Sequence, residues 1–508
     1  MGVARVLSIG LVGVQGHVVE VEADLAQGLP TLVITGLPDT ALGEARDRLR
    51  AAVANSGLSW PSGSRITIGL SPAWLPKRGS GFDLAMAAAV LCADGVLPVE
   101  PLQGVAVLGE LALDGRVRAV RGVLPAVLAA SRAGVCKAVV PAANVPEARL
   151  VPNACVTGVE TLCGLVQFLR GDAAAPPPPE PAAEPDDEAP TPDLADVLGQ
   201  DAGRRAVEVA AAGGHHLVLF GPPGAGKTML AERLPGVLPL LEPEAALEVM
   251  AVHSVAGTLP PASPLIRRPP YQAPHHTASM AALLGGGSGI ARPGAVSLAH
   301  RGVLFLDEAP EFAGGVLDAL RQPLERGEVL IARSGGVATY PARIQLVLAA
   351  NPCPCSGPGP EEQCMCSPAA RRRYLGRISG PLLDRVDLRL TLLPVRLSAL
   401  LDGDTRMEPT AVVAERVGRA RAAAAERWRR HGWRTNAEVP GSALRTMFRL
   451  PRGVRTSLDR ALDSGAMSAR GYDRVLRVGW TLGDLGGRSE PDAGDLAEAT
   501  DFRLGRVA

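Results

Sequence analysis

The sequence predicts an α/β protein built from two α/β segments followed by a helical C-terminal segment, and three observations support this fold class. Short apolar runs alternate with stretches of helical spacing in residues 1–170 and again in residues 193–400. Between them, residues 171–192 lose this periodicity and are rich in proline and acidic side chains. Residues 401–508 carry apolar side chains mostly at helical spacing. These patterns predict a mixed α/β domain, a linker, a parallel-sheet domain and a helical domain.

Length and composition limit the classes of protein that the chain can belong to. A chain of 508 residues suggests roughly three domains. The 52 basic and 52 acidic side chains cancel, so any nucleic-acid site must be a local patch rather than a property of the whole surface. The N-terminus lacks the pattern of a signal peptide, and no apolar run is long enough to span a bilayer. We therefore expect a cytoplasmic protein with no membrane partner.

The first segment alternates strands and helices. Apolar runs predict strands at residues 66–70, 105–108 and 138–140, and helical spacing predicts helices at residues 82–93 and 123–133. The segment that follows contains four consecutive prolines and an acidic run, a composition that predicts an extended, mobile linker over residues 171–192.

The second segment opens with a complete phosphate-binding loop. The loop, residues 221–228, consists of Gly221, Pro222, Pro223, Gly224, Ala225, Gly226, Lys227 and Thr228. It lies between an apolar run that predicts a strand and a run that predicts a helix, so the helix N-terminus adds to the anion site. The glycines allow backbone N–H groups to point at the phosphates, Lys227 is expected to reach the β- and γ-phosphates, and the Thr228 hydroxyl is expected to bind Mg²⁺.

Two further strands supply the other groups of an ATP site. Residues 303–306 predict a buried strand that ends at Asp307 and Glu308, and residues 345–350 predict a third strand that ends at Asn351. Asp307 is expected to hold Mg²⁺, and Glu308 is placed to polarise the attacking water. A polar residue beside the Asp-Glu strand, Asn351, is expected to sense the γ-phosphate. Together these residues predict an ATPase that uses ATP and Mg²⁺.

Arginines in the rest of the chain are candidates for the positive charge that phosphoryl transfer needs. Arg377 and Arg385 lie in one short segment, and Arg470 begins a predicted helix that is expected to reach back over the nucleotide. Long helices are predicted over residues 411–430 and within residues 455–486. An arginine-rich run there is either a DNA-facing stripe or a solvated helix face, and the second interpretation is favoured. Its members are Arg416, Arg419, Arg421, Arg427, Arg429, Arg430 and Arg434.

Five motifs in this order resemble the magnesium-chelatase-like AAA+ ATPases, specifically the ComM/YifB family. They are GPPGAGKT, VLFLDE, LAAN, RISGPLLDRVDL and SARGYDRVLR. The resemblance covers nearly the whole chain and implies an AAA+ ATPase domain over residues 193–400 with a helical lid over residues 401–508. It also implies that Asn351 is sensor 1, Arg385 the arginine finger and Arg470 sensor 2. A ring of identical subunits, usually a hexamer, would place the arginine finger in the neighbouring ATP site.

The same resemblance identifies two insertions in the ATPase segment. Residues 328–340 form two strand-like arms around a Ser-Gly-Gly turn and resemble the pre-sensor hairpin of this AAA+ branch, whose tip usually faces the pore. Residues 274–289 suggest a second pore insertion. Neither is strongly basic, so a role in gripping DNA follows from the resemblance and not from charge. His275 and His276 suggest either a metal site or a local hydrogen-bonding pair, and the pair is favoured.

Four thiols follow Asn351 within fourteen residues: Cys353, Cys355, Cys364 and Cys366. Four thiolates can close a tetrahedral Zn²⁺ site. The Cys-x-Cys spacing is tighter than the usual Cys-x-x-Cys, so a structural zinc site and a mobile loop without metal both remain open.

The N-terminal segment resembles the catalytic fold of Lon proteases, a ribosomal protein S5 domain 2-like α/β fold. Aligned without a gap, the position of the Lon serine falls on Gly81 and that of the Lon lysine on Leu124. Ser80 is one residue out of register. Because a Ser-Lys dyad needs an amine to take the hydroxyl proton, residues 1–170 are expected to be a module without proteolytic activity.

Three functions remain open. The favoured one is a hexameric, ATP-driven DNA motor that remodels recombination intermediates, as the ComM-type branch-migration helicases of natural transformation do. The second is a motor subunit that drives a metal-inserting chelatase partner. The third is a Lon-like ATP-dependent protease. The missing dyad counts against the protease, and the Lon-like segment counts against the chelatase subunit.

Overall fold

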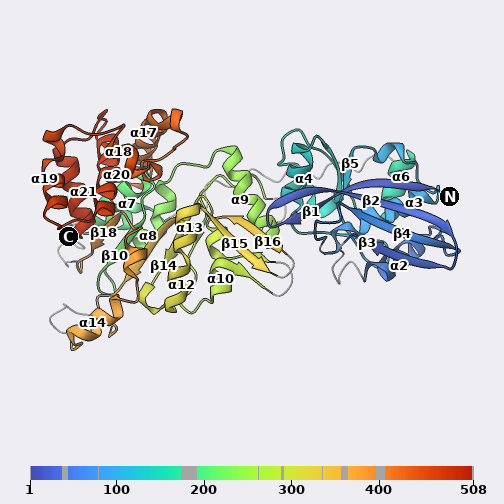
Figure 1. Ribbon diagram of the computed structural model, residues 1–508, viewed down its shortest axis with the longest axis horizontal. Helices are drawn as coiled ribbons and strands as arrows, with labels where there is room; N and C mark the ends of the chain where they lie inside the picture. Colours follow the sequence, from blue (N-terminus) through green and yellow to red (C-terminus); the bar gives the residue numbers. More distant parts are fainter. Residues whose placement is uncertain are drawn as a thin grey trace.

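The computed structural model is an elongated molecule with its N-terminal sheet at one end and its C-terminal helices at the other (Figure 1). It describes residues 2–36, 44–77, 79–172, 192–260, 263–287, 291–333, 336–355, 364–395 and 407–505. Most of the predicted linker, residues 173–191, lies outside the described residues. Among the helices of the described ranges, none is both long and apolar enough to cross a membrane.

The N-terminal unit is built on a seven-stranded mixed sheet with the order β3-β4-β2-β1-β5-β8-β9. Its strands are β1 (Val3–Val12), β2 (Gln15–Gln27), β3 (Thr31–Thr35), β4 (Ser64–Ser71), β5 (Val105–Val107), β8 (Lys137–Pro141) and β9 (Cys155–Val159). β2 pairs antiparallel with β1 and β4, and the remaining pairs are parallel. A short hairpin, β6 (Glu110–Leu111) and β7 (Val117–Arg118), lies outside this sheet.

One helix fills the core of this unit. Every side chain of α3 (Asp83–Ala93) is buried, because the helix is apolar on all sides and packs against β1 and β2. The other helices are α2 (Ala45–Asn55), α4 (Val123–Arg132), α5 (Val145–Ala148) and α6 (Leu162–Arg170). The helices predicted at residues 82–93 and 123–133 correspond to α3 and α4 within one residue at each end.

The central unit is a five-stranded parallel sheet with the order β11-β14-β17-β10-β18. Its strands are β10 (Leu217–Phe220), β11 (Tyr271–Gln272), β14 (Val303–Leu306), β17 (Gln345–Ala350) and β18 (Leu388–Thr391). All residues of β14 and β17 are buried. Their uninterrupted apolar runs are typical of parallel strands that are covered on both faces.

Helices and two small hairpins surround this sheet. The helices are α7 (Asp201–Gly213), α8 (Lys227–Val237), α9 (Pro243–Ala256), α10 (Met280–Leu284), α11 (Ala295–Leu298), α12 (Gly314–Ala319), α13 (Arg321–Arg326), α14 (Pro368–Leu375) and α15 (Gly380–Leu383). The hairpins are β12 (Gly285–Gly286) with β13 (Arg292–Pro293), and β15 (Glu328–Arg333) with β16 (Gly336–Pro341).

The C-terminal unit is helical, as the spacing of its apolar residues predicts. It contains α17 (Thr410–Trp428), α18 (Gly441–Arg445), α19 (Arg452–Asp463), α20 (Ala469–Leu485) and α21 (Ala493–Leu504). Its buried side chains, among them Trp428 and Trp480, form one apolar cluster with residues of α7, β10 and β18. The helices are therefore packed onto the sheet through a continuous core.

The N-terminal and central units share an apolar contact. Leu124 and Val127 of α4 belong to the same buried cluster as Leu247 and Met250 of α9. Beside this cluster, the Ser254 hydroxyl donates to Glu147 Oε2 at 2.7 Å. Burial raises the pKa of Glu147, and the hydrogen bonds from Ser254 and Asn144 oppose that shift.

Candidate nucleotide-binding site

The phosphate-binding loop has the backbone conformation that its glycines allow. Gly224 and Gly226 have φ angles of 77° and 86°, in the left-handed region that side chains rarely adopt. The Gly221 N–H donates to the Ala350 carbonyl at 3.2 Å, which ties the loop to the end of β17. The loop leads directly into α8, which begins at Lys227. Backbone N–H groups and the helix N-terminus thus face one edge of the sheet, where an anion binds favourably.

Lys227 is buried among oxygen acceptors. Its Nζ donates to the carbonyl oxygens of Gly221 at 2.7 Å and Pro222 at 2.9 Å. It also donates to Asn351 Oδ1 at 2.9 Å. Burial lowers the pKa of Lys227, while the charges of Asp307 and Glu308 oppose that shift. A partly desolvated ammonium group interacts strongly with a phosphate that enters the loop.

A threonine and a carboxylate offer oxygen ligands next to this amine. The Thr228 hydroxyl donates to Asp307 Oδ2 at 2.9 Å. The other carboxylate oxygen, Asp307 Oδ1, accepts the Glu308 N–H at 2.8 Å. Mg²⁺ prefers such hydroxyl and carboxylate oxygens together with phosphate oxygens. The donor set therefore fits a magnesium ion held between the loop, Asp307 and a bound nucleotide.

The order of the strands explains why Asn351 lies at this site. β17 lies between β10, which carries the phosphate-binding loop, and β14, which ends at Asp307 and Glu308. The carboxyl ends of adjacent parallel strands meet at one edge of the sheet. This edge brings Lys227, Thr228, Asp307 and Asn351 together.

Glu308 has an unusual backbone and a partner that the sequence did not predict. Its φ angle is 48°, a conformation that is strained for a residue with a side chain. His276 Nδ1 lies 3.0 Å from Glu308 Oε2. The rings of His275 and His276 contact each other, with centroids 4.1 Å apart. His276 therefore contacts both its neighbour in the chain and Glu308. The sequence feature that could have predicted this contact is the position of His276 a few residues after β11, the strand that pairs with β14.

Arg385 and Arg470 lie at the opposite edge of the same sheet. Both line a cleft of about 310 Å³ together with His216 and Asp387. His216 directly precedes β10 and Asp387 directly precedes β18, so this cleft is at the amino edge. The four residues of β10 separate the two edges by roughly 13 Å. Arg470 therefore does not reach back over the nucleotide of its own subunit, contrary to the sequence expectation.

Ion pairs fix the cleft residues. The Arg385 side chain is 12% exposed and pairs with Glu325. Arg474 Nη1 lies 2.8 Å from Asp387 Oδ1 and joins α20 to the start of β18. Burial alone would raise the pKa of Asp387, but the charge of Arg474 and the His215 ring, 3.4 Å from Oδ2, outweigh it and hold that pKa well below its usual range. Arg470 itself is exposed at the start of α20.

Arg377 is separate from this cleft and lies beside the Asp-Glu strand. Its Nη1 donates to the Pro310 carbonyl at 3.2 Å and to Glu311 Oε2 at 3.1 Å. An exposed pair of this kind contributes little to stability. The interpretation of Arg377 as a surface ion pair accounts for these contacts.

The arginine-rich run of α17 and the residues that follow it does not form a continuous DNA-facing stripe. Arg416 pairs with Glu208 at 2.6 Å, Arg427 pairs with Asp484, and Arg421 donates to the Ala211 carbonyl at 2.7 Å. Burial lowers the pKa of Arg421 to about 10. These three side chains hold α17 to neighbouring elements. Arg419, Arg429, Arg430 and Arg434 are exposed.

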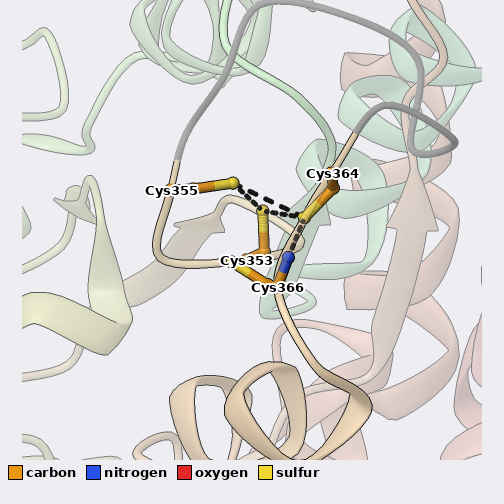
Figure 2. A group of neighbouring side chains, drawn as sticks. All are labelled: Cys353, Cys355, Cys364 and Cys366. Carbon is orange, nitrogen blue, oxygen red and sulfur yellow. Dashed lines mark hydrogen bonds between the residues drawn. The ribbon is translucent and has the colours of Figure 1, made fainter.

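The four clustered cysteines converge in space (Figure 2). Their sulfur atoms all lie within 4.8 Å of one another, a spacing that suits tetrahedral Zn²⁺ with Zn–S distances of about 2.3 Å. Cys353 and Cys355 come from the segment after β17, and Cys364 and Cys366 from the segment before α14. The hydrogen bond from the Cys366 N–H and the one between the Cys364 and Cys353 sulfurs lower the pKa of Cys364 to about 6. The arrangement is compatible with a structural zinc ion.

The Lon-like unit contains no Ser-Lys pair at the aligned positions. Leu124 is fully buried in the apolar cluster against α9. Ser80 donates to the Glu110 carboxylate, and the buried Lys77 donates to the Pro72 carbonyl instead of reaching Ser80. The hydroxyl nearest to the expected nucleophile position thus has a carboxylate partner.

The two predicted insertions pack against each other. A Cβ added to Gly285 of the second insertion would lie 2.8 Å from the Ile331 side chain of β15. Just beyond that insertion, the Tyr340 hydroxyl of β16 donates to the Ala291 carbonyl. The stem of the β15–β16 hairpin also approaches the N-terminal unit, where a Cβ added to Gly13 would lie 2.6 Å from the Thr339 carbonyl oxygen. The hairpin tip, Ser334 and Gly335, and residues 288–289 at the end of the other insertion lie outside the described residues.

These features define a class of protein: a magnesium chelatase-type AAA+ protein with a helical C-terminal part and a Lon-like N-terminal region. Residues 193–400 match the family described as magnesium chelatase, subunit ChlI. Residues 21–144 match subunit ChlI of Mg-chelatase, and residues 407–503 match the C-terminal family of that subunit.

Relatives along nearly the whole chain make the family more specific. An uncharacterized protein of Mycobacterium tuberculosis is 56% identical over 510 residues, which cover 99% of both chains. Competence protein ComM of Haemophilus influenzae is 40% identical over 99% of this chain and 98% of its own length. The uncharacterized protein YifB of Escherichia coli is 39% identical over 99% of this chain and 97% of its own. The chain belongs to the ComM/YifB family of magnesium chelatase-like AAA+ proteins.

The N-terminal region also has a partial relative of another kind. A Lon protease of Roseiflexus castenholzii is 34% identical over 144 residues, which are 27% of this chain and 18% of that protease. The similarity is therefore confined to one domain-sized segment.

Proposed function

We propose that this chain is an ATP-hydrolysing motor that works as a ring of identical subunits and acts on DNA. Lys227, Thr228 and Asp307 would hold Mg-ATP, Glu308 would accept a proton from the attacking water, and Asn351 would contact the γ-phosphate. The observation that carries the proposal is the meeting of the Lys227, Thr228, Asp307 and Asn351 side chains at one sheet edge. Such positioned charges supply most of the catalysis in phosphoryl transfer.

The opposite sheet edge supports assembly into a ring. Arg385 and Arg470 share the cleft at the amino edge, so within one subunit they are remote from the phosphate-binding loop. They become useful to catalysis when that edge faces the ATP of an adjacent subunit. A closed ring repeats this heterologous contact at every interface.

Three features favour DNA as the substrate over the other candidates. ComM, a full-length relative, is by its name a competence protein, and the motifs of this chain resemble a family that includes helicases of natural transformation. The Lon-like unit lacks a Ser-Lys pair at the aligned positions, which disfavours a protease. The fused Lon-like unit also counts against a chelatase motor subunit that lacks such a unit.

The test is the rate of ATP hydrolysis with no DNA, with single-stranded DNA and with branched DNA, combined with an assay of strand displacement and branch migration. We expect DNA to stimulate hydrolysis and branched DNA to be remodelled. Hydrolysis that ignores all DNA, with no strand movement at any protein concentration, would contradict the DNA motor and favour a chelatase-type motor.

A further inference from the structure

Arg385 is held by contacts within its own subunit. Nη1 of Arg385 donates to the Pro381 carbonyl at 2.6 Å, and Nη2 donates to the Glu325 carboxylate. The Arg385 side chain is 12% exposed, whereas that of Glu325 is 60% exposed. The guanidinium group that is proposed to serve a neighbouring ATP is therefore largely covered in the single subunit.

These contacts leave one donor of the guanidinium group without a partner. Within the part of the chain that the structure describes, Nε of Arg385 is buried and makes no hydrogen bond. An unpaired buried N–H group costs free energy. A phosphate group offers several oxygens, and arginine can donate two parallel hydrogen bonds to it. The contacts with Glu325 and Pro381 therefore satisfy Arg385 less completely than a phosphate group would.

Glu325 is the carboxylate of this cleft that is available to Arg385. The cleft also contains Asp384, Asp387 and Asp473, and each of these three pairs with a different arginine. Their partners are Arg503, Arg474 and Arg445. Among the described residues, Glu325, which comes from α13, forms an ion pair with Arg385 alone. Removal of the Glu325 charge should thus release Arg385 without unpairing the other three carboxylates.

We propose that Glu325 is a positioning residue that restrains Arg385 until the γ-phosphate of ATP in the neighbouring subunit replaces the Glu325 carboxylate as its partner. The inference rests on the proposed action of Arg385 on that ATP and adds the group from which Arg385 must be withdrawn. ADP has no γ-phosphate, so Arg385 returns to Glu325 after hydrolysis and phosphate release. The exchange makes the contact between subunits depend on which nucleotide is bound.

Nucleotide binding by the full-length chain tests this inference. Glu325→Gln removes the charge and keeps an exposed side chain of similar size, so the fold should persist. Its affinity for β,γ-imido-ATP, which has a γ-phosphate group and resists hydrolysis, is measured by displacement of a fluorescent nucleotide. This affinity should rise by roughly two- to fivefold, the change expected when one partly exposed ion pair no longer competes. The affinity for ADP should stay unchanged, whereas a general change of the fold would alter both affinities.

Two further variants separate this inference from the proposed function. Glu325→Gln combined with Arg385→Ala should bind both nucleotides as Arg385→Ala alone does, because no arginine is left to release. Glu498→Gln breaks another partly exposed ion pair, with Arg205 at 2.9 Å, and should match the wild type.

The possible outcomes are distinct. Wild-type hydrolysis by Arg385→Ala would contradict the proposed role of Arg385, and the inference with it. If Arg385→Ala hydrolyses ATP poorly, an unchanged or weaker affinity of Glu325→Gln for β,γ-imido-ATP overturns the inference alone. An equal rise in the affinity for ADP, in the Arg385→Ala background or in Glu498→Gln overturns it too.

Discussion

Lys227 and Glu308 make different contributions to the candidate site, and mutations separate them. Lys227→Ala removes the amine that now contacts Gly221, Pro222 and Asn351, so nucleotide loses a direct cation. A charged hydrogen bond of this kind corresponds to roughly ten- to hundredfold in affinity. Glu308→Gln keeps Asp307 and Thr228 for Mg²⁺, so binding should persist while kcat falls by about a hundredfold or more.

Fluorescent-nucleotide titration and single-turnover hydrolysis measure these two effects independently. Arg429→Ala is a suitable control, because Arg429 is exposed and pairs only with the exposed Glu426 among the described contacts. Full turnover in Glu308→Gln would remove the glutamate from the mechanism.

Ser80 supports a second prediction at the residue scale. Its hydroxyl donates to Glu110, and the aligned lysine position is the buried Leu124. No amine therefore accepts the hydroxyl proton at that position. Purified protein with ATP should release no peptides from an unfolded substrate, and Ser80→Ala should keep the wild-type ATPase rate. ATP-dependent peptide release that Ser80→Ala abolishes would show the opposite.

Individual strands and the residues at their ends were largely predictable from the sequence. The contacts between elements far apart in the sequence were not. The run of residues 345–350 corresponds to β17 because five consecutive apolar residues after Gln345 suit a buried strand. The phosphate-binding loop was recognisable because its conformation depends on glycines close together in the sequence. The contact of His276 with Glu308 depends on β11 pairing with β14. The distance between Arg470 and the phosphate-binding loop of the same subunit depends on where α20 packs. Both follow from packing between elements far apart in the sequence.

The cysteine segment between β17 and α14 gives a prediction at the scale of an element. If the four thiols bind zinc, elemental analysis of protein purified without chelator should find about one Zn²⁺ per chain. Cys353→Ser combined with Cys364→Ser should release the metal, because the double variant removes one sulfur ligand from each of the two chain segments that form the cluster (Figure 2).

Release of zinc should also loosen the segment that follows Asn351. Limited proteolysis near residues 353–366 should become faster in the double variant, whereas Cys92→Ser, at a cysteine outside the cluster, should leave both metal content and proteolysis unchanged. Fully active protein that contains no metal would show that the cluster is not a zinc site.

At the scale of the whole molecule, the two sheet edges carry complementary halves of one proposed catalytic site. The carboxyl edge offers the phosphate-binding loop, and the amino edge offers Arg385 with Arg470. A single subunit cannot bring these edges together, because they lie on opposite sides of the same parallel sheet. If the proposed function holds, assembly is therefore a condition of activity.

Mixing of inactive subunits tests this dependence. Arg385→Ala subunits keep an intact phosphate-binding loop and Lys227→Ala subunits keep an intact arginine, so each should hydrolyse ATP poorly alone. In rings formed from equal amounts, roughly a quarter of the interfaces pair an intact loop with an intact arginine, and ATPase activity should partly return. Arg385→Ala mixed with the Lys227→Ala/Arg385→Ala double variant offers no such interface and should stay inactive. If subunits exchange, as seen by fluorescence transfer, and activity does not return, then Arg385 does not act on the ATP of a neighbour.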